Sequence, residues 1–343
     1  MHKSGAEDGM RILYVHGINQ VAETYGKYFA SHGHFFSLYE PKLTGGNSPL
    51  PIKLASMPGR LFDLRQVVGR LDAKFFDLVH IHWASYGILG LTSRIPFIVE
   101  CHGSDVRTRL QHPFFRSILT PVFRKAAAIL CITPDLLPAV QLVRPDAIFL
   151  PAPIDTKRFA PAQAMQLPRL RNILLFTRLD PIKGVDVAVE GIKQFSYRYP
   201  DIHVQLLDWG ALRNEYRERY SHHFEFIAPV TSYEVTNLIN EADVIVGQFA
   251  LGALGLSELQ AMSCAKPVIC SFRYDDAYPT PPPLFRASTA EEIDAHLENL
   301  YQHPEVGIAL GKKSREWVIA NHDYPVLAGR LEELYRTIIC HPA

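Results

Sequence analysis

The chain of 343 residues is 48% hydrophobic and 20% charged, which excludes a disordered or fibrous protein and predicts a globular one of two domains. Basic and acidic residues balance at 35 each, but residues 1–160 hold 18 Lys and Arg against 12 Asp and Glu. That excess fits a polyanionic partner or an anionic membrane surface, and equally a solvated mixed-charge surface. There is no strongly basic run and no zinc-ligand spacing, which argues against nucleic-acid binding.

Five scattered cysteines, none in a C-x-x-C pair, indicate reduced thiols in a cytoplasmic protein. Residues 1–9 are polar, and we expect a disordered tail there and no signal peptide. No apolar run approaches the roughly 20 residues that a membrane-spanning helix needs. Any membrane contact is therefore expected to be peripheral, on the inner face.

Strand patterns alternate with helix-length segments through the first half of the chain. Each strand pattern is hydrophobic throughout, which is typical of a parallel sheet with helices on both faces. The segment 18–34 is typical of a helix stopped by Gly33. The strand patterns lie at residues 11–17, 76–83, 95–103, 126–134 and 147–153.

A proline-rich segment, residues 151–170, interrupts this alternation and is typical of a linker between domains. The alternation then restarts, with strand patterns at 172–180, 203–210, 224–230, 242–249 and 266–272, and the last sixty residues have a helical pattern. We therefore predict an α/β protein of two doubly wound parallel sheets, in which ligands bind beyond the carboxyl ends of the strands. The predicted domains are residues 10–160 and 161–320, followed by a terminal helix at 321–343.

Two basic residues follow the first strand pattern of the second domain. Arg178 and Lys183 flank a turn at Pro181, before a helix that starts near Gly184. Two fixed cations beside the backbone N–H groups of a helix start suit a diphosphate. An ordinary solvated loop is the alternative.

A second anion site is predicted where the segment GALGLSELQAM, residues 252–262, turns into a helix. Gly255 lets the backbone approach a ligand, and the N–H groups of the first turn, from Leu256 onward, point at it. Gln260 carries an amide that can donate to and accept from ribose hydroxyls; the alternative is a partly exposed helix glutamine. Glu258 is favourable against the helix dipole.

Candidate residues also follow the strands of the first domain. Gly17 ends the first strand pattern, where its backbone can meet a phosphate or simply form a turn. His102 can donate to a sugar hydroxyl or stabilise developing charge, and Asp105 can orient a hydroxyl or the histidine. The alternatives are a buried structural histidine and a helix cap. His80 and His82 face one side of a strand, and without a third ligand we expect structural histidines and no metal site.

In order and spacing, these segments resemble the GT-B-fold, retaining glycosyltransferases of the large family-4 type over nearly the whole chain. The segments that carry the resemblance are GINQVAETYGKYFASHGH (17–34), ECHGSDVR (100–107), LPAPIDTKRFAP (150–161), FTRLDPIKGVDVAVEGI (176–192), FIAPVTSYEV (226–235) and EWVIANHDYPVLAGRLEELY (316–335). The resemblance implies two Rossmann-like domains facing a central cleft, with the last helix crossing back to the first domain. It also implies a nucleotide-diphosphate sugar as donor, retention of anomeric configuration, and neither a metal nor a cofactor.

The resemblance implies roles for single residues. Arg178 and Lys183 match the Arg and Lys that bind the donor diphosphate, and Val230 lies in the loop that holds the nucleobase through backbone contacts. The first domain would hold the acceptor, which is a glycan, a lipid-linked or a small molecule. Gly17 and His102 would complete the site on closure.

One segment departs from the family pattern E-G-F-G-L-x-x-x-E-A-M. Aligned on Ala261 and Met262, the first glutamate position holds Gly252 and the second holds Gln260. Glutamine can still grip a ribose, whereas glycine has no side chain to place beside the donor sugar. Either Gln248 or the substrate fills that space, or the activity is weak or lost. Two other functions therefore stay open: a non-catalytic nucleotide-sugar-binding subunit that supports a partner glycosyltransferase, and a nucleotide-sugar epimerase.

Residues 107–125 mix basic and aromatic side chains, which permits a peripheral membrane contact and a lipid-linked acceptor. The alternative is that the apolar members are simply the buried face of a helix. A membrane contact requires some of them to be exposed. The apolar residues in question are Phe114, Phe115, Ile118, Leu119 and Val122.

Overall fold

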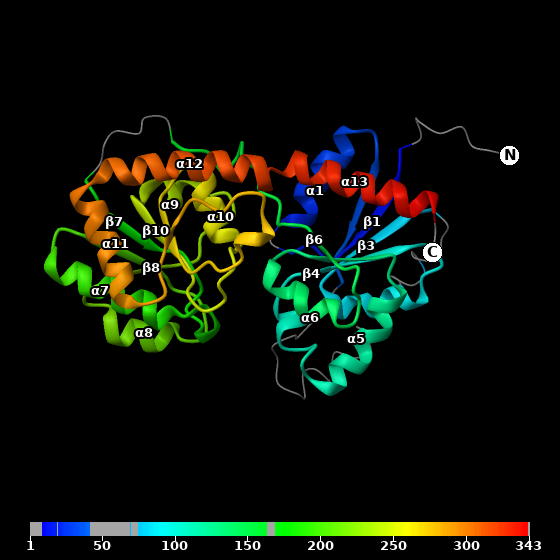
Figure 1. Cartoon of the computed structure of the whole chain (residues 1–343), viewed down its shortest axis with the longest axis horizontal. Helices are drawn as coiled ribbons and strands as arrows, with labels where there is room; N and C mark the ends of the chain where they lie inside the picture. Colours follow the sequence, from blue (N-terminus) through cyan, green and yellow to red (C-terminus); the bar gives the residue numbers. More distant parts are fainter. Residues whose placement is uncertain (1–8, 19, 42–68, 70–74, 163–168, 342–343) are drawn as a thin grey trace. The chain divides into compact units, whose positions relative to one another are not determined.

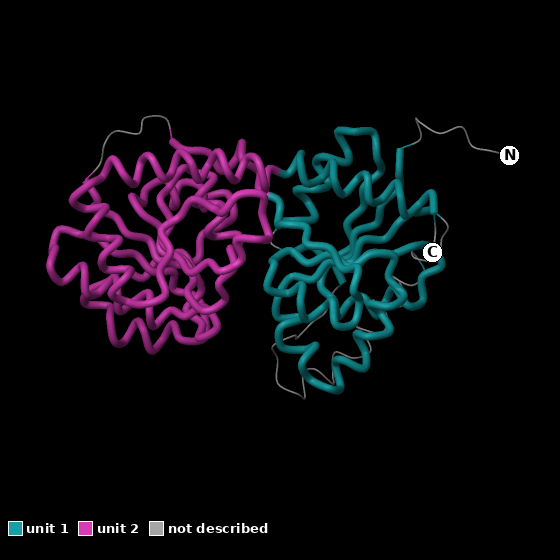
Figure 2. The backbone as a smooth tube through the Cα atoms, viewed as in Figure 1, with its two compact units in different colours: residues 1–153, 324–343 teal, residues 154–323 magenta. Residues whose placement is uncertain are grey.

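The computed structural model describes residues 9–18, 20–41, 69, 75–162 and 169–341, and the chain divides into two compact units. The first unit comprises residues 1–153 and 324–343, and the second comprises residues 154–323 (Figure 2). The sequence analysis placed these divisions after residues 160 and 320. Apart from Gly9, the tail expected at residues 1–9 lies outside the described residues.

A six-stranded parallel sheet forms the centre of the first unit (Figure 1). Its strand order is β2-β1-β3-β4-β5-β6. The strands are β1 (Arg11–Val15), β2 (Phe35–Tyr39), β3 (Leu78–His82), β4 (Phe97–Cys101), β5 (Ala128–Cys131) and β6 (Ile148–Phe149). Because β2 and β3 lie on opposite sides of β1, the strand order reverses there, and the carboxyl end of β1 lies at the switch point of the sheet.

Helices cover both faces of this sheet, because its strands carry buried apolar side chains on both sides. Helices α1 and α13 share a core cluster with residues such as Ile12 and Ile98 on one face. Helices α5 and α6 pack on the other face against Val79 and Val99 (Figure 1). The helical segments are α1 (Val21–Ser31), η1 (Ala84–Thr92), α4 (Ser104–Arg107), α5 (Pro113–Lys125), η2 (Pro134–Leu136), α6 (Leu137–Gln141) and α13 (Tyr324–Cys340).

The second unit repeats the plan with a sheet of order β12-β11-β10-β7-β8-β9. Its strands are β7 (Asn172–Leu175), β8 (His203–Leu207), β9 (Glu225–Ile227), β10 (Val244–Val246), β11 (Val268–Cys270) and β12 (Phe285–Arg286). All neighbouring strands are parallel. Strands β8 and β10 lie on opposite sides of β7, so the switch point of this sheet is at the carboxyl ends of β7 and β10.

Helices again cover both faces of the second sheet. One core cluster joins the sheet to α7, α8 and α11, and another joins it to α9, α10 and α12. The helical segments are η3 (Pro181–Lys183), α7 (Val185–Arg198), α8 (Arg213–Tyr220), α9 (Val235–Glu241), α10 (Leu256–Ser263), η4 (Asp275–Ala277), α11 (Ala290–Gln302) and α12 (Pro304–His322). The prediction of two doubly wound parallel sheets is confirmed.

Two edge strands, β2 and β12, were not predicted. No residue of β2 is fully buried, and β12 has only two residues, so neither has the continuous apolar run that marks an inner strand. The predicted stop of the first helix is confirmed: α1 ends before Gly33, which has φ +78°. Among the described helices, none is both long enough and apolar enough to cross a membrane.

Candidate functional site

The predicted donor-site residues of the second unit lie beyond the carboxyl ends of its strands. Arg178 follows β7, Val230 follows β9, and the loop that leads into α10 follows β10. Lys183 lies in η3, directly before α7. Because β7 and β10 are neighbouring parallel strands, the segments that follow them lie together at the switch point.

Lys183 is fixed by contacts between these two segments. The Phe249 N–H donates to the Lys183 carbonyl at 2.8 Å. Gly184 has φ +67°, and a Cβ at this position would lie 2.8 Å from the Ala250 nitrogen, so glycine is required for the close approach. Lys183 Nζ donates to Gln248 Oε1 at 2.9 Å. The Gln248 amide is neutral, so this bond does not cancel the lysine charge.

Glu258 holds the loop between β10 and α10. Its carboxylate is 2% exposed and accepts the N–H of Gln248 at 3.0 Å and the N–H of Gly255 at 2.9 Å. Gln248 Nε2 in turn donates to the Ala253 carbonyl at 2.7 Å. Glu258 therefore caps α10 and also places the glutamine that holds Lys183, a role that the sequence analysis missed.

Arg178 lies beside an aromatic ring that the sequence analysis also missed. Its Nε is 2.9 Å from Asp180 Oδ2, and its guanidinium carbon is 5.5 Å from the centre of the Trp209 ring. Asp180 Oδ1 accepts the Ala211 N–H at 2.7 Å, which ties the two strand-end loops together. Trp209 follows β8 and is half exposed. Its position near the end of the predicted strand pattern 203–210 was the available signal.

Three further predicted residues lie at this edge of the second sheet or on the helix that begins there. Val230 and Leu256 are partly buried and pack against the same core cluster. Gln260 is half-buried on α10, and its side chain has no hydrogen bond with the described residues. The structure therefore brings Arg178, Lys183 and the start of α10 together at one edge, with Gln260 just over one turn along the helix.

Gly252 stands where the family pattern has its first glutamate, and an arginine lies against it. Gly252 has φ +66°, and a Cβ there would lie 2.4 Å from Arg273 Nε. The backbone N–H of Arg273 donates to the Gly252 carbonyl at 2.9 Å, and its Nη2 donates to the Ala250 carbonyl at 2.7 Å. A guanidinium thus lies beside the position at which a carboxylate was expected, and Arg273 follows β11 as another strand-end residue.

Gly17 follows β1 in the first unit, as predicted, but its N–H is engaged. It donates to Glu40 Oε1 at 2.6 Å, and His16 Nδ1 lies 3.1 Å from Glu40 Oε2. The backbone group expected to meet a phosphate therefore faces a carboxylate of the same unit. An anionic ligand at this position has to displace Glu40.

Asp105 is fully buried after β4, and both of its oxygens accept backbone N–H groups. The donors are Ala84 and Gly103, each at 2.7 Å, and His102 at 3.2 Å. Burial raises the pKa of Asp105, and these hydrogen bonds oppose the rise. These contacts favour a structural role for Asp105 in holding the loop before α4, although no side-chain hydrogen bond caps that helix.

The side chain of His102 is only 2% exposed. Its Nε2 lies 2.9 Å from Nδ1 of His82. Burial lowers the pKa of His102 to about 4, although the charge of Glu100 opposes the shift. His102 is therefore a neutral imidazole near pH 7, able to donate or accept a hydrogen bond but carrying no charge.

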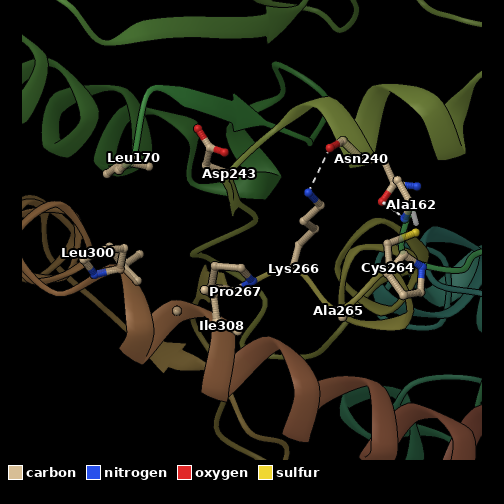
Figure 3. A pocket seen from close by; sticks show the side chains of 13 residues that line it. Ala162, Leu170, Asn240, Asp243, Cys264, Ala265, Lys266, Pro267, Leu300 and Ile308 are labelled. Carbon is tan, nitrogen blue, oxygen red and sulfur yellow. Dashed lines mark hydrogen bonds between the residues drawn. The ribbon is translucent and has the colours of Figure 1, made fainter. Parts of the chain in front are cut away.

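A cavity of about 380 Å³ lies beside the amino ends of the strands of the second sheet (Figure 3). Leu170, Asp243 and Lys266 line it, and they precede β7, β10 and β11. Lys266 Nζ donates to the Asn240 carbonyl at 2.9 Å, and Asp243 Oδ2 accepts two backbone N–H groups. Because ligands of such sheets bind at the carboxyl ends, we do not assign the donor to this cavity.

Comparison with known sequences agrees with this arrangement. A family described as "Glycosyl transferase 4-like domain" matches residues 39–148, and one described as "Glycosyl transferases group 1" matches residues 171–279. Together the two matches cover more than half of the chain. The chain belongs to the group 1 glycosyltransferases of the family-4 type. It transfers a sugar from a nucleotide-sugar donor to an acceptor.

Several relatives of this glycosyltransferase act on lipid-linked or inositol-containing molecules, according to their names. The phosphatidyl-myo-inositol mannosyltransferase of Mycobacterium tuberculosis is 26% identical over an alignment of 288 residues, and the match covers 77% of this chain and 74% of that protein. A D-inositol 3-phosphate glycosyltransferase of Arthrobacter sp. is 26% identical over an alignment of 260 residues, and the match covers 65% of this chain and 60% of that protein.

Solved structures share the fold. Sucrose-phosphate synthase from Thermosynechococcus elongatus matches with a TM-score of 0.74 at 17% identity, over 96% of this chain and 99% of that chain. Anabaena Alr3699/HepE, solved in complex with UDP and glucose, matches with a TM-score of 0.72 at 12% identity, over 96% of this chain and 100% of that chain. These likenesses show the GT-B fold for this glycosyltransferase.

Proposed function

We propose that this glycosyltransferase holds a nucleotide-diphosphate sugar in its second unit and transfers the sugar, with retention, to a lipid-linked acceptor. The observation that carries the donor assignment is the meeting of Lys183, Arg178 and the start of α10 at the switch point of the second sheet. Fixed positive charge and the first-turn N–H groups of a helix, which have no partner within the helix, suit a diphosphate.

Residues at these strand ends can contact each part of the donor: the diphosphate, the ribose and the nucleobase. Lys183, which is hydrogen-bonded to the neutral Gln248 amide, supplies a positive charge to the diphosphate, and Arg178, which is paired with Asp180, supplies guanidinium N–H donors. The first-turn N–H groups of α10, beginning at Leu256, add hydrogen bonds to its oxygens. The Gln260 amide is assigned to the ribose hydroxyls, and the backbone near Val230 to the nucleobase.

Retention follows from attack on the face of the sugar that the diphosphate leaves. The acceptor oxygen bonds to the anomeric carbon as the bond from that carbon to the diphosphate breaks, and a departing phosphate oxygen takes the acceptor's proton. Catalysis then rests on stabilising the departing diphosphate and on orientation. We propose that Lys183 and Arg178 neutralise this charge in place of a metal ion. No carboxylate nucleophile is needed, so Gly252 is compatible with activity.

The first unit is assigned to the acceptor. His102, as a neutral imidazole, suits a hydrogen bond to a sugar hydroxyl better than it suits the stabilisation of charge. Asp105 is assigned to holding the loop that carries His102, since it accepts the N–H of that residue. Gly17 takes part once the Glu40 carboxylate has been displaced.

Helix α5 gives the lipid-linked acceptor its structural support. Phe114 and Phe115 are 61% and 37% exposed at the start of the helix, whereas Leu119 and Val122 are buried. Arg109 lies over the Phe115 ring at 5.5 Å. Exposed aromatic rings beside basic residues suit the interface of an anionic membrane, and a named relative acts on phosphatidyl-myo-inositol.

Vesicle binding tests the membrane contact. We expect F114S with F115S to weaken sedimentation with anionic phospholipid vesicles by about tenfold, since two exposed rings that would enter the membrane interface are lost. The matched control is Y197S, whose ring is 52% exposed on α7 of the second unit. Equal binding by both variants and the wild type contradicts the assignment of α5.

A panel of UDP-, GDP- and ADP-sugars tests the donor site. We expect one nucleotide to raise the melting temperature of the full chain and its sugar to be transferred to a polyprenyl or phosphatidylinositol acceptor. Stabilisation without transfer or hydrolysis favours the non-catalytic subunit, for which the arginine beside Gly252 is the structural argument. Conversion of donor without acceptor favours an epimerase. No stabilisation by any nucleotide overturns the donor site.

A further inference from the structure

Arg273, which follows β11, lies against the loop that leads from β10 into α10. Its backbone N–H donates to the Gly252 carbonyl at 2.9 Å, and its Nη2 donates to the Ala250 carbonyl at 2.7 Å. Gly252 has φ +66°, and a side chain there would collide with Arg273 Nε. The glycine therefore leaves room for the guanidinium, and two hydrogen bonds to the backbone of the loop fix its position.

The positive charge of Arg273 has no counter-ion among the described residues, since none of their carboxylates lies within salt-bridge distance of it. Two other arginines at these strand ends are paired, Arg178 with Asp180 at 2.9 Å and Arg286 with Asp275 at 2.5 Å. Asp275, which is close to Arg273 in the sequence, is thus already engaged. An exposed guanidinium that is held in place but not neutralised suits an anionic ligand.

The strand order of the second sheet places Arg273 relative to the parts of the donor. Along the order β11-β10-β7-β8-β9, the nucleobase is assigned to the loop after β9, and the diphosphate to the segments after β7 and β10. Arg273 follows β11, which is one strand further from β9 than β10 is, or about 4.8 Å. The sugar is attached to the end of the diphosphate that is opposite the nucleoside. Arg273 therefore lies on the side of the diphosphate where the sugar is expected.

Arg273 also shares a loop with the lysine that is assigned to the diphosphate. Lys183 Nζ donates to Gln248 Oε1 at 2.9 Å. Arg273 contacts Ala250 and Gly252, which follow in the same loop. The loop thus positions both cations, and an anionic group carried by the sugar can meet the second one while the diphosphate meets the first.

We propose that the sugar of the donor carries a carboxylate, as in a nucleotide-diphosphate uronic acid, and that Arg273 binds this carboxylate. The inference rests on the proposed donor site and names the class of sugar held there. A guanidinium and a carboxylate form charge-assisted hydrogen bonds, whereas a neutral hexose offers only hydroxyls to the cation. The family pattern has a glutamate at the position of Gly252, and a glutamate there would repel a uronic acid. Arg273 reverses the sign of the charge at this position.

Binding measurements with matched donors test this proposal without requiring turnover. The pairs are UDP-glucose with UDP-glucuronic acid, GDP-mannose with GDP-mannuronic acid and ADP-glucose with ADP-glucuronic acid, each beside its free nucleoside diphosphate. For the nucleotide that binds, we expect isothermal titration of the full chain to show about tenfold tighter binding of the uronic acid than of the hexose. R273Q should remove this preference and leave the affinity for the free nucleoside diphosphate within about twofold of the wild type. R273K, which keeps the charge, should retain part of the preference.

R171Q is the control, because Arg171 is an exposed arginine of the same unit that precedes β7, at the amino ends of the strands. It should keep the full preference for the uronic acid. Equal binding of hexose and uronic acid by the wild type overturns the carboxylate, whatever the folding of the variants, and leaves the proposed donor site standing. A preference that survives in R273Q overturns the assignment to Arg273. If no nucleotide binds, the donor site fails and this proposal fails with it.

Discussion

The carboxyl ends of the two sheets have opposite chemistry. In the second unit they carry the basic residues Arg178 and Lys183, and the partner that steadies Lys183 is a neutral amide. In the first unit they carry the carboxylates of Glu40 and Asp105, which are bonded to backbone N–H groups, and a neutral His102. The same architecture therefore offers an anion site in one unit and a hydrogen-bonding surface in the other. A nucleotide diphosphate therefore suits the carboxyl ends of the second unit's strands and not those of the first.

The largest expected effect tests the positive edge. K183A should weaken the affinity for the donor nucleotide by about 10- to 100-fold, because a charge-assisted hydrogen bond to a phosphate is worth about 1.5–3 kcal/mol. Isothermal titration with the nucleotide diphosphate measures the change. The matched control is K193A, which removes a lysine that pairs with Glu190 on α7. Equal losses in both variants would show only a long-range effect of charge.

The second prediction concerns Glu258, which holds the loop that carries Gln248. The two oxygens of Glu258 each accept a backbone N–H, and E258Q replaces one of these oxygens by an amide that donates. We expect the free energy of unfolding to fall by about 1–3 kcal/mol. Nucleotide affinity should also weaken, because Gln248 is then held less firmly. E292Q is the matched control, since Glu292 makes the same kind of capping contact in the exposed start of α11. There water replaces the lost bond, and we expect about 0.5 kcal/mol. Urea unfolding with and without nucleotide separates the two results.

The third prediction concerns the first unit, where a negative charge is removed instead of a positive one. E40Q removes the charge that faces Gly17 N–H and leaves an oxygen able to accept it. If the first unit must admit part of an anionic ligand there, E40Q should improve the KM for the donor by about two- to threefold, since exposed charges contribute about 0.2–1 kcal/mol. E225Q, which alters an exposed carboxylate in the second unit, is the control. A KM that is unchanged or higher in E40Q contradicts a role for Gly17 at the donor.

The strand ends could be read from the sequence because the inner strands are continuous apolar runs. Gly17 and Arg178 lie at the ends of such runs and Lys183 lies in the turn that follows one, and the rule that ligands bind at the carboxyl ends of strands selects them. Trp209 and Arg273 follow strands in the same way, but their contacts with Arg178 and Gly252 depend on how loops from different strands meet. The spacing of residues along the sequence does not predict contacts between loops that follow different strands.

The histidine cluster shows the limit most clearly. His80 and His82 were identified as sharing one face of a strand, but the carboxylate that lies beside them, Glu100, was not identified. Glu100 lies inside the apolar run IPFIVECHG, where a period-two pattern gives no reason to join it to another strand. Only the adjacency and register of β3 and β4, which place Glu100 opposite His82, bring the three together. Strand order is a property of the folded sheet and not of any single segment.

At Arg178 we expect a smaller effect than at Lys183, and the difference distinguishes the two basic positions of the donor site. Arg178 is exposed, and its charge is already shared with Asp180, so R178A should weaken nucleotide affinity by only about three- to tenfold. R178K, which keeps the charge but loses the planar contact with Trp209, separates the two contributions. If R178K binds like the wild type, charge alone acts at this position. If it binds like R178A, the flat guanidinium between Asp180 and Trp209 is what presents the charge, and the second sheet's edge depends on a geometry that a lysine cannot supply.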